Sequence, residues 1–164
     1  MQVILNHQQI QQKITRLAFQ ILENAFQESK IVLAGIQGNG YVLAGKLANV
    51  LRKHSNVKVE LVQVFVNKEE PWSEPIQLDV DEATIKKDFI VLVDDVINSG
   101  KTMQYSLVKL LQQPTKAIKT VTLVDRQHRR YPIKADFVGL GLTTTLKNRV
   151  EIDLNEQNAQ AFLR

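Results

Sequence analysis

The fold is decided by one stretch near the middle of the chain, Ile90-Val91-Leu92-Val93-Asp94-Asp95-Val96-Ile97-Asn98-Ser99-Gly100-Lys101-Thr102. Its first residues are apolar without interruption and rich in β-branched side chains, which predicts a strand buried on both faces. A short polar turn with one glycine follows, and helical spacing then begins at Lys101. A buried strand, a turn and a helix in this order predict an α/β protein, whose ligands bind at the carboxyl edge of the sheet.

The polar turn has the chemistry of a phosphate site. A turn around Gly100 can direct its backbone N–H groups at an anion. The helix behind it adds unpaired N–H groups and the positive end of its dipole. We therefore predict that a phosphate is bound by Asn98, Ser99, Gly100, Lys101 and Thr102.

Two carboxylates stand between the strand and the turn. Asp94 and Asp95 repel each other, and each is costly to bury without a cation or a donor. As acceptors they suit the two hydroxyls of a ribose, held directly or through Mg²⁺. The alternative is an ordinary strand–helix junction with an acidic end.

The whole segment resembles the phosphoribosyl pyrophosphate (PRPP) signature of type I phosphoribosyltransferases, and it lacks the GxxxxGK[ST] spacing of the Walker loop. The resemblance implies that Asp94 and Asp95 act in catalysis, contact the ribose hydroxyls and hold Mg²⁺, possibly through water. It implies that Val96 and the turn from Asn98 to Thr102 complete the site for ribose and its 5′-phosphate.

Composition sets the frame for this prediction. The chain has 164 residues, which suits one phosphoribosyltransferase domain over 1–164. It has no cysteine, so disulfides and thiolate metal sites are excluded. No stretch is long enough for a membrane span, and the N-terminus does not resemble a signal peptide, so we expect a cytoplasmic protein without membrane partners. The net charge of +4 suits anionic ligands.

Strand and helix patterns alternate along the chain. Helices are predicted over 8–28, 41–53 and 101–112, and strands over 31–36, 57–66 and 117–124, with short strands near 137–138 and 150–152. The alternation predicts a mostly parallel sheet with helices on both faces. The resemblance adds a small base-binding hood.

A second glycine turn lies at Gln37, Gly38, Asn39 and Gly40. Glycines there let the backbone approach a ligand closely, although many plain strand–helix turns also contain glycine. The resemblance makes this turn the pyrophosphate loop. The related branch usually has Lys and Arg where this chain has Gln37 and Asn39, which removes charge assistance to the leaving pyrophosphate.

The polar stretch 67–88 is long for a loop and suits a lid that excludes water from a cationic sugar. Lys68 is predicted to reach the pyrophosphate as a catalytic residue, with Glu69 and Glu70 pairing with it or with Mg²⁺. A solvated charge cluster is the alternative. Trp72 is expected to cap the closed site or to lie in a subunit interface.

The segment from Leu123 to Gly139 is similar to that of the pyrimidine attenuation regulator (PyrR) family, uracil phosphoribosyltransferases that also bind a leader RNA. The resemblance implies that Phe137 stacks on the base and the Val138 backbone bonds its edge, with Asp125 and Arg126 facing other edge groups. Ordinary strand packing is the alternative. Asn98 cannot act as a general base, which disfavours purines, but Ser99 to Gln104 resembles the purine branch, so a purine stays open.

The basic segment with His128, Arg129 and Lys134, together with Thr15 and Arg16 on the same face, is a possible RNA contact. A solvated face or a dimer contact is the alternative. RNA is not favoured, because Phe19 and Leu140 stand where the regulators tend to have His and Lys. The prediction is a homodimeric transferase that joins ribose 5-phosphate from PRPP to a base, most simply uracil, with release of pyrophosphate. A weakly catalytic PRPP-sensing regulator that binds RNA is the alternative from another class.

Overall fold

A computed structural model describes residues 1–143 and 145–164. Its larger sheet has the strand order β4-β3-β2-β5-β6-β7, and every neighbouring pair is parallel except β3 with β4. The predicted mostly parallel sheet is therefore confirmed. The strands of this sheet are β2 (Lys30–Ile36), β3 (Lys58–Phe65), β4 (Gln77–Leu78), β5 (Phe89–Ile97), β6 (Ala117–Asp125) and β7 (Phe137–Gly141).

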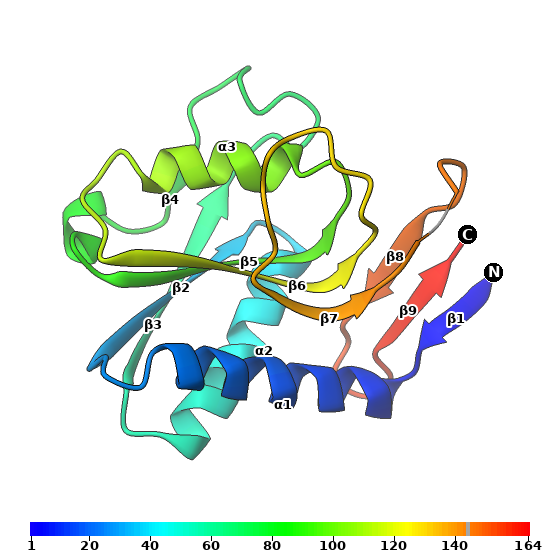
Figure 1. The fold of residues 1–164 in the computed structure, drawn as a ribbon, viewed down its shortest axis with the longest axis horizontal. Coiled ribbons are helices and arrows are strands. Elements are labelled where there is room, and N and C mark those ends of the chain that lie inside the picture. Colours follow the sequence, from blue (N-terminus) through cyan, green and yellow to red (C-terminus); the bar gives the residue numbers. More distant parts are fainter. Residues whose placement is uncertain (144) are drawn as a thin grey trace.

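Helices cover both faces of this sheet (Figure 1). The helices α1 (His7–Asn24) and α2 (Asn39–His54) lie on one face, and α3 (Lys101–Leu110) lies on the other. Strand β5 supplies both cores, because successive side chains of a strand point to opposite faces. Val91 and Val93 pack in the core beneath α1 and α2, whereas Ile90 and Leu92 pack in the core beneath α3.

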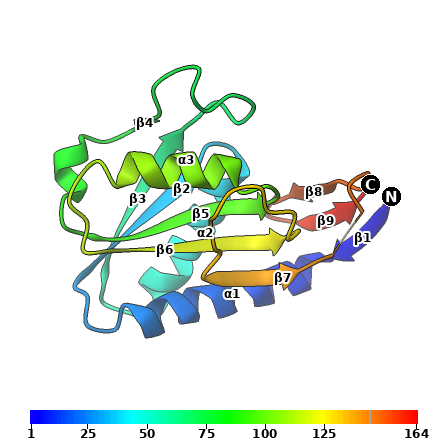
Figure 2. The same ribbon diagram turned by 45° about the horizontal axis from the view of Figure 1, so that its top comes forward.

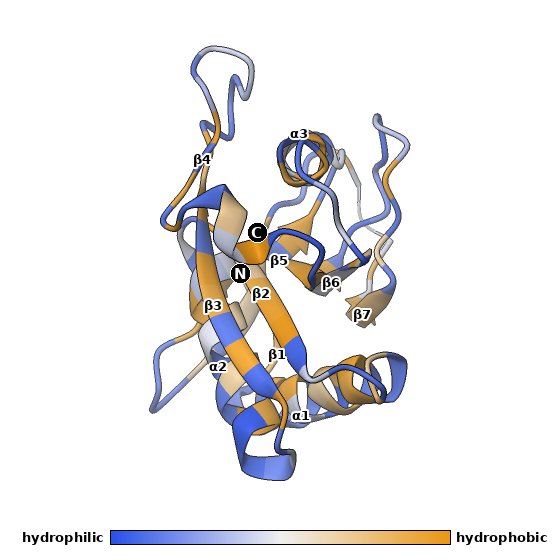
Figure 3. Ribbon diagram, turned by 90° about the vertical axis from the view of Figure 1, so that its left-hand side faces the viewer, coloured by the Kyte–Doolittle hydropathy of each residue, from blue (hydrophilic) through white to orange (hydrophobic). Residues whose placement is uncertain are grey.

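The hydropathy of the strands follows their place in the sheet (Figure 3). The central β2 is hydrophobic over most of its length, whereas β3 alternates between hydrophobic and hydrophilic residues. A strand buried on both faces needs apolar side chains at every position, and a strand nearer the edge does not. The uninterrupted apolar run of β5 is explained in the same way.

A second, smaller sheet has the order β1-β9-β8 and is antiparallel. We call it the hood: β1 (Gln2–Leu5), β8 (Val150–Asp153) and β9 (Gln160–Leu163). The two ends of the chain meet in it, and it lies beyond the carboxyl ends of β5 and β6 (Figure 2). Of its three strands, only β8 is predicted from sequence.

The predicted elements differ from the structure mainly at their ends. The first helix ends at Asn24 rather than near residue 28, and the second begins at Asn39 rather than Tyr41. The stretch 67–88 is not one lid. It includes β4, which pairs with β3, and a short 3-10 helix, η1 (Glu82–Ile85), whose Ile85 is buried. Residues 66–76 are the longest run there without a helix or strand, and we call them the lid loop.

Within the part of the chain that the structure describes, no helix combines the length and the apolar character that crossing a bilayer requires.

Candidate functional site

A cleft of about 390 Å³ opens at the carboxyl end of β5. Three separate parts of the chain line it. Most of the lining comes from the end of β5 and the turn and helix start that follow, from Asp94 to Met103. Lys68 and Glu69 contribute from the lid loop, and Val150 contributes from the hood strand β8. The structure therefore brings together the predicted carboxylates, the predicted phosphate turn and Lys68.

Asp94 is a buried carboxylate in the wall of this cleft. Its residue is 5% exposed, and its Oδ1 accepts a hydrogen bond of 2.9 Å from the backbone N–H of Asp95. Burial, and then the neighbouring charge of Asp95, raise the pKa of the Asp94 carboxyl well above its ordinary value, while the positive charge of Lys68 opposes that rise. A positive charge beside Asp94 would therefore stabilise its ionised form, which burial and the charge of Asp95 disfavour.

The carboxylate pair is suited to a particular kind of metal ion. Among the described residues, no group of three or more His, Asp or Glu side chains is placed to enclose a metal. Mg²⁺ usually takes one or two carboxylates and completes its shell with water and phosphate oxygens. Asp94 and Asp95 can supply these carboxylates. They do not suit a metal that prefers thiolate or histidine ligands.

The conformation of the turn from Asn98 to Thr102 is fixed by Gly100 and by contacts with the segment 130–133, on the side away from the cleft. Gly100 caps α3 with a φ of 85°, a left-handed conformation that favours glycine. A Cβ at Gly100 would also lie 2.3 Å from Cγ2 of Ile133. The carbonyl of Ser99 accepts hydrogen bonds from the backbone N–H groups of Arg130 and Tyr131, at 2.8 and 3.1 Å.

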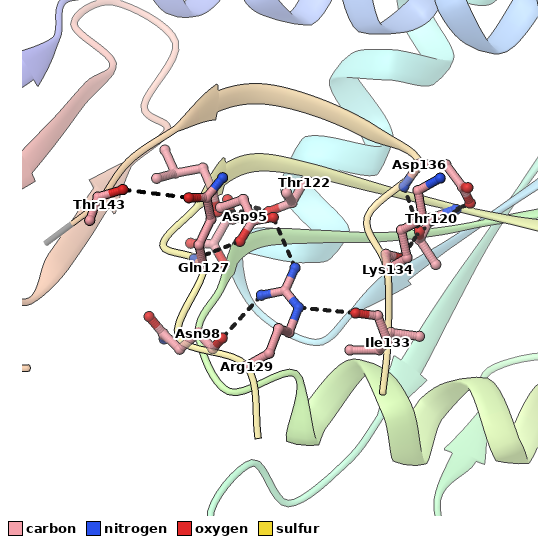
Figure 4. Close-up of polar contacts among 12 residues, drawn as sticks. Asp95, Asn98, Thr120, Thr122, Gln127, Arg129, Ile133, Lys134, Asp136 and Thr143 are labelled. Carbon is pink, nitrogen blue, oxygen red and sulfur yellow. Dashed lines mark hydrogen bonds and ion pairs between the residues drawn. The ribbon is translucent and has the colours of Figure 1, made fainter. Parts of the chain in front are cut away.

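Arg129 adds side-chain contacts behind the same turn (Figure 4). Its guanidinium donates to the carbonyl oxygens of Asn98 and Ile133, at 3.1 and 3.0 Å, and pairs with the Asp125 carboxylate at 2.9 Å. The backbone carbonyls of Asn98 and Ser99 therefore already accept hydrogen bonds from the segment 129–131, on the side of the turn away from the cleft. The first turn of α3 faces the cleft, as an anion site requires.

The other glycine turn adjoins the carboxylates. Gly38 caps α2 with a φ of 89°, and a Cβ on it would lie 3.9 Å from the Lys68 ammonium nitrogen. A Cβ on Gly40 would lie 3.0 Å from Oδ1 of Asp94. The two glycines thus bring the start of α2 against Asp94 and beneath Lys68. Lys68 supplies a positive charge to a turn that has none of its own.

The two polar side chains of this turn point elsewhere. Asn39 donates from Nδ2 to the carbonyl oxygen of Ile152 in the hood, over 2.7 Å. Gln37 lines a neighbouring cavity of about 370 Å³ together with Phe65 and Asn67. Of the four residues predicted for the pyrophosphate loop, Gly38 and Gly40 approach the carboxylates through the backbone, and the side chains of Gln37 and Asn39 have other surroundings.

The lid loop rests against α3. The Lys101 ammonium donates to the carbonyl oxygen of Glu69 over 2.7 Å and lies 5.7 Å from the centre of the Trp72 ring. That ring is 5.9 Å from the ring of Tyr105 in α3. Trp72 is 60% exposed, so it is a surface contact between the loop and the helix.

The residues predicted to bind a base are not brought to this cleft. Asp125, Arg126, Phe137 and Val138 are absent from its described lining. Phe137 pairs with Val121 in the sheet and is 8% exposed, within the core that α1 covers. Its side chain faces α1 because of the parity of β7, so the predicted stacking of Phe137 on a base does not match the structure.

The other three have partners of their own. The carbonyl of Val138 accepts a hydrogen bond from Arg16, Asp125 pairs with Arg129, and Arg126 donates to Asn98. Sequence reasoning missed Val150, which lines the cleft together with Val96. No local pattern marks Val150, because its position depends on how the hood lies on the main sheet.

The predicted RNA contacts are divided by the sheet. Thr15 and Arg16 belong to α1, where Thr15 donates to the carbonyl of Gln11 and Arg16 donates to the carbonyls of Val138 and Gly139. The segment with His128, Arg129 and Lys134 lies near α3, on the other face, where its Ile133 is buried. The prediction that these residues share one face is therefore not supported, because β7 separates them.

The chain is similar in sequence to a known protein family. The sequence profile of the phosphoribosyl transferase domain matches residues 2–153. A protein named bifunctional protein PyrR from Clostridium novyi is 31% identical, over 96% of this chain and 93% of its own. Its namesake from Fusobacterium nucleatum is 29% identical, over 95% and 92%.

A solved structure shares the fold. The hypoxanthine-guanine phosphoribosyltransferase of Bacillus anthracis superposes with a TM-score of 0.74 and covers 99% of this chain and 98% of its own. Its sequence is 22% identical, so the likeness concerns the fold alone.

Proposed function

This chain belongs to the phosphoribosyl transferase domain family, and we propose that it transfers ribose 5-phosphate from PRPP to a nitrogenous base, most simply uracil, with release of pyrophosphate. One observation carries the proposal. The adjacent carboxylates Asp94, which is buried, and Asp95, which is partly buried, lie between two helix N-termini whose capping glycines have a positive φ, Gly38 and Gly100. PRPP has the matching layout, since its ribose hydroxyls lie between a 5′-phosphate and a pyrophosphate.

The roles of the residues follow from this layout. The turn from Asn98 to Thr102 binds the 5′-phosphate through backbone N–H groups and the start of α3. Asp94 and Asp95 accept hydrogen bonds from the ribose hydroxyls. The start of α2 at Gly38 and Gly40 receives the pyrophosphate, and Lys68 neutralises part of its charge.

Mg²⁺ would be held by Asp94 and Asp95 with phosphate oxygens and water, and when bound it would neutralise charge on the leaving pyrophosphate. The chain itself contributes position and electrostatics. The transferred sugar becomes cationic as the pyrophosphate leaves, so the nearby carboxylates stabilise it. The lid loop, with Lys68 and Glu69 at the cleft, excludes water that would compete with the base.

Uracil is the base that the resemblance to the PyrR proteins supports. Val96 and Val150 give the cleft an apolar wall suited to a planar ring. A purine is the second candidate base. Asn98, which lines the cleft, argues against it, because a carboxamide cannot take a proton from a purine ring near neutral pH. We expect the enzyme to be a homodimer, as measured by sedimentation.

The test is a screen of bases with PRPP and Mg²⁺ that follows pyrophosphate release, alongside calorimetry of PRPP binding. We expect release with uracil and saturable PRPP binding. Asp94→Asn combined with Asp95→Asn should abolish that binding. Unchanged PRPP affinity in the double variant would overturn the assignment of the ribose site.

A second candidate is a PRPP-sensing regulator that turns over poorly. It is favoured by the pyrophosphate turn, which has no cation of its own because Gln37 and Asn39 occupy it. PRPP binding without turnover of any base would support this function. Its RNA-binding part is tested by gel shifts on the leader RNA of pyrimidine genes, and no shift at low salt would refute it.

A further inference from the structure

The hood reaches the cleft through one strand. Among the described residues, Val150 of β8 is the hood's contribution to the cleft wall. Strand β8 pairs with β9 on one side and is the last strand of its sheet. Its other side has no strand partner among the described residues, so its place over the cleft depends on contacts with the main domain as well as on β9.

One such contact lies on the far side of Val150. The Asn39 side chain, at the start of α2, donates from Nδ2 to the carbonyl oxygen of Ile152 over 2.7 Å. Ile152 and Val150 are two residues apart in a strand, so their side chains share a face, and both pack against the core of the main domain. Asn39 thus holds β8 just beyond the residue that lines the cleft.

The second contact lies on the near side of Val150. Arg126 is 8% exposed, and its Nη2 donates to the carbonyl oxygens of Thr145 and Asn148, at 3.1 and 2.5 Å. Its Nη1 donates to Oδ1 of Asn98 over 3.0 Å. A planar guanidinium can make all three contacts at once, whereas the ammonium of a lysine is a single point of charge.

The two contacts flank Val150 and arise beside the two turns assigned above to phosphate groups. Asn39 belongs to the pyrophosphate turn, and Asn98, the partner of Arg126, belongs to the 5′-phosphate turn. We propose that Asn39 and Arg126 are positioning residues that hold β8 so that Val150 forms the wall against which the base binds. The inference rests on the proposed function. It implies that the affinity for the base depends on Asn39 and Arg126 as well as on the residues that bind PRPP.

The test compares Asn39→Ala and Arg126→Lys with the unaltered protein in two measurements. The first is hydrogen exchange of the segment 145–153 in the free protein. The second is the pair of KM values, for uracil and for PRPP. We expect exchange of this segment to accelerate about tenfold in each variant, since each loses a partly buried hydrogen bond to a carbonyl of this segment. The KM for uracil should rise about tenfold in Asn39→Ala, and that for PRPP should change less than about twofold.

Matched controls separate this effect from a general loss of structure. Asn24→Ala and Arg52→Lys remove the same side-chain chemistry, because Asn24 donates to the carbonyl of Gln20 and Arg52 to that of Val59. Neither should alter exchange of 145–153 or either KM. Val150→Ala should raise the KM for uracil without accelerating exchange, because it changes the wall and not its supports. Exchange of α1 reports whether a variant is folded.

Unchanged exchange of 145–153 in both variants would overturn the proposal, and so would equal shifts of the two KM values in Asn39→Ala. Failure of the proposed function would look different. It would appear as an absence of PRPP binding by the unaltered protein in calorimetry, and the exchange measurement would then decide alone whether Asn39 and Arg126 hold β8.

Discussion

Gly40 lies directly against Asp94: a Cβ at Gly40 would be 3.0 Å from the Asp94 Oδ1 and 2.9 Å from the carbonyl oxygen of Val93. The first turn of α2 and the end of β5 are therefore in contact without room for a methyl group. Because Asp94 is buried, this contact places the positive end of a helix dipole beside a carboxylate that needs positive charge.

Gly40→Ala should push α2 away from Asp94. We expect a loss of about 1–3 kcal/mol in the free energy of unfolding, the usual cost of an overpacked contact, and weaker PRPP binding in calorimetry. Gly45→Ala on the same helix is the control. Its Cβ would meet only Cδ2 of Leu61, at 3.9 Å, so it should raise stability by about 0.5–1 kcal/mol. Equal effects of the two substitutions would contradict this reading.

Asp94→Asn should stabilise the free protein at neutral pH while weakening PRPP binding. Burial and the charge of Asp95 raise the folded-state pKa of Asp94 above its ordinary value of 3.8. At pH values between the ordinary pKa of the unfolded chain and the raised pKa of the folded protein, Asp94 keeps its proton in the folded state and has lost it in the unfolded state. Stability therefore falls as the pH rises through this window, and it is level above the raised pKa. The amide of Asp94→Asn does not titrate, so the variant does not lose stability over this pH range.

Thermal unfolding from pH 4 to pH 8 measures the effect, at roughly 3 °C for each kcal/mol. The advantage of Asp94→Asn should be largest near pH 8 and should shrink toward pH 4. Glu23→Gln, on an exposed part of α1, should show no such trend. An Asp94→Asn protein less stable than the unaltered one at pH 7 would refute the prediction.

Lys68→Met should reduce kcat by about a hundredfold, because Lys68 supplies the positive charge beside the pyrophosphate turn. The KM for PRPP should change much less, since the backbone of both turns is retained. Lys58→Met, at the start of the strand whose end precedes Lys68, is the control and should leave both constants unchanged. Steady-state kinetics that showed an unaltered kcat in Lys68→Met would remove Lys68 from the mechanism.

Trp72 is the single tryptophan of the chain, so its fluorescence reports on the lid loop. Lys101 lies over its ring and also donates to Glu69, while its backbone belongs to the predicted 5′-phosphate turn. PRPP binding should draw Lys101 toward the phosphate and change the Trp72 emission, with the same midpoint as the calorimetric titration. Lys101→Ala should alter the emission of the free protein and remove the response. Saturated PRPP binding without any change in emission would show that the loop does not respond.

The elements that were predicted correctly are those specified by consecutive residues. The strand β5, its two carboxylates and the glycine turn are consecutive, so their order alone predicted a strand, a turn and a helix that the structure contains. The sheet and its helices on both faces followed from the same alternation. The strands β1 and β9 were missed, because each is four residues long and β1 forms only by pairing with β9 at the other end of the chain.

The sequence by itself therefore determined the fold class, the family and the residues at the end of β5 and in its turn that line the cleft, since buried runs and glycine turns are properties of neighbouring residues. Tertiary structure decided which side chains meet there. It turned Phe137 toward α1, joined Asn39 to Ile152 and placed Val150 at the cleft. Those outcomes depend on which element covers each face of the sheet and on contacts between distant segments, and no local pattern specifies them.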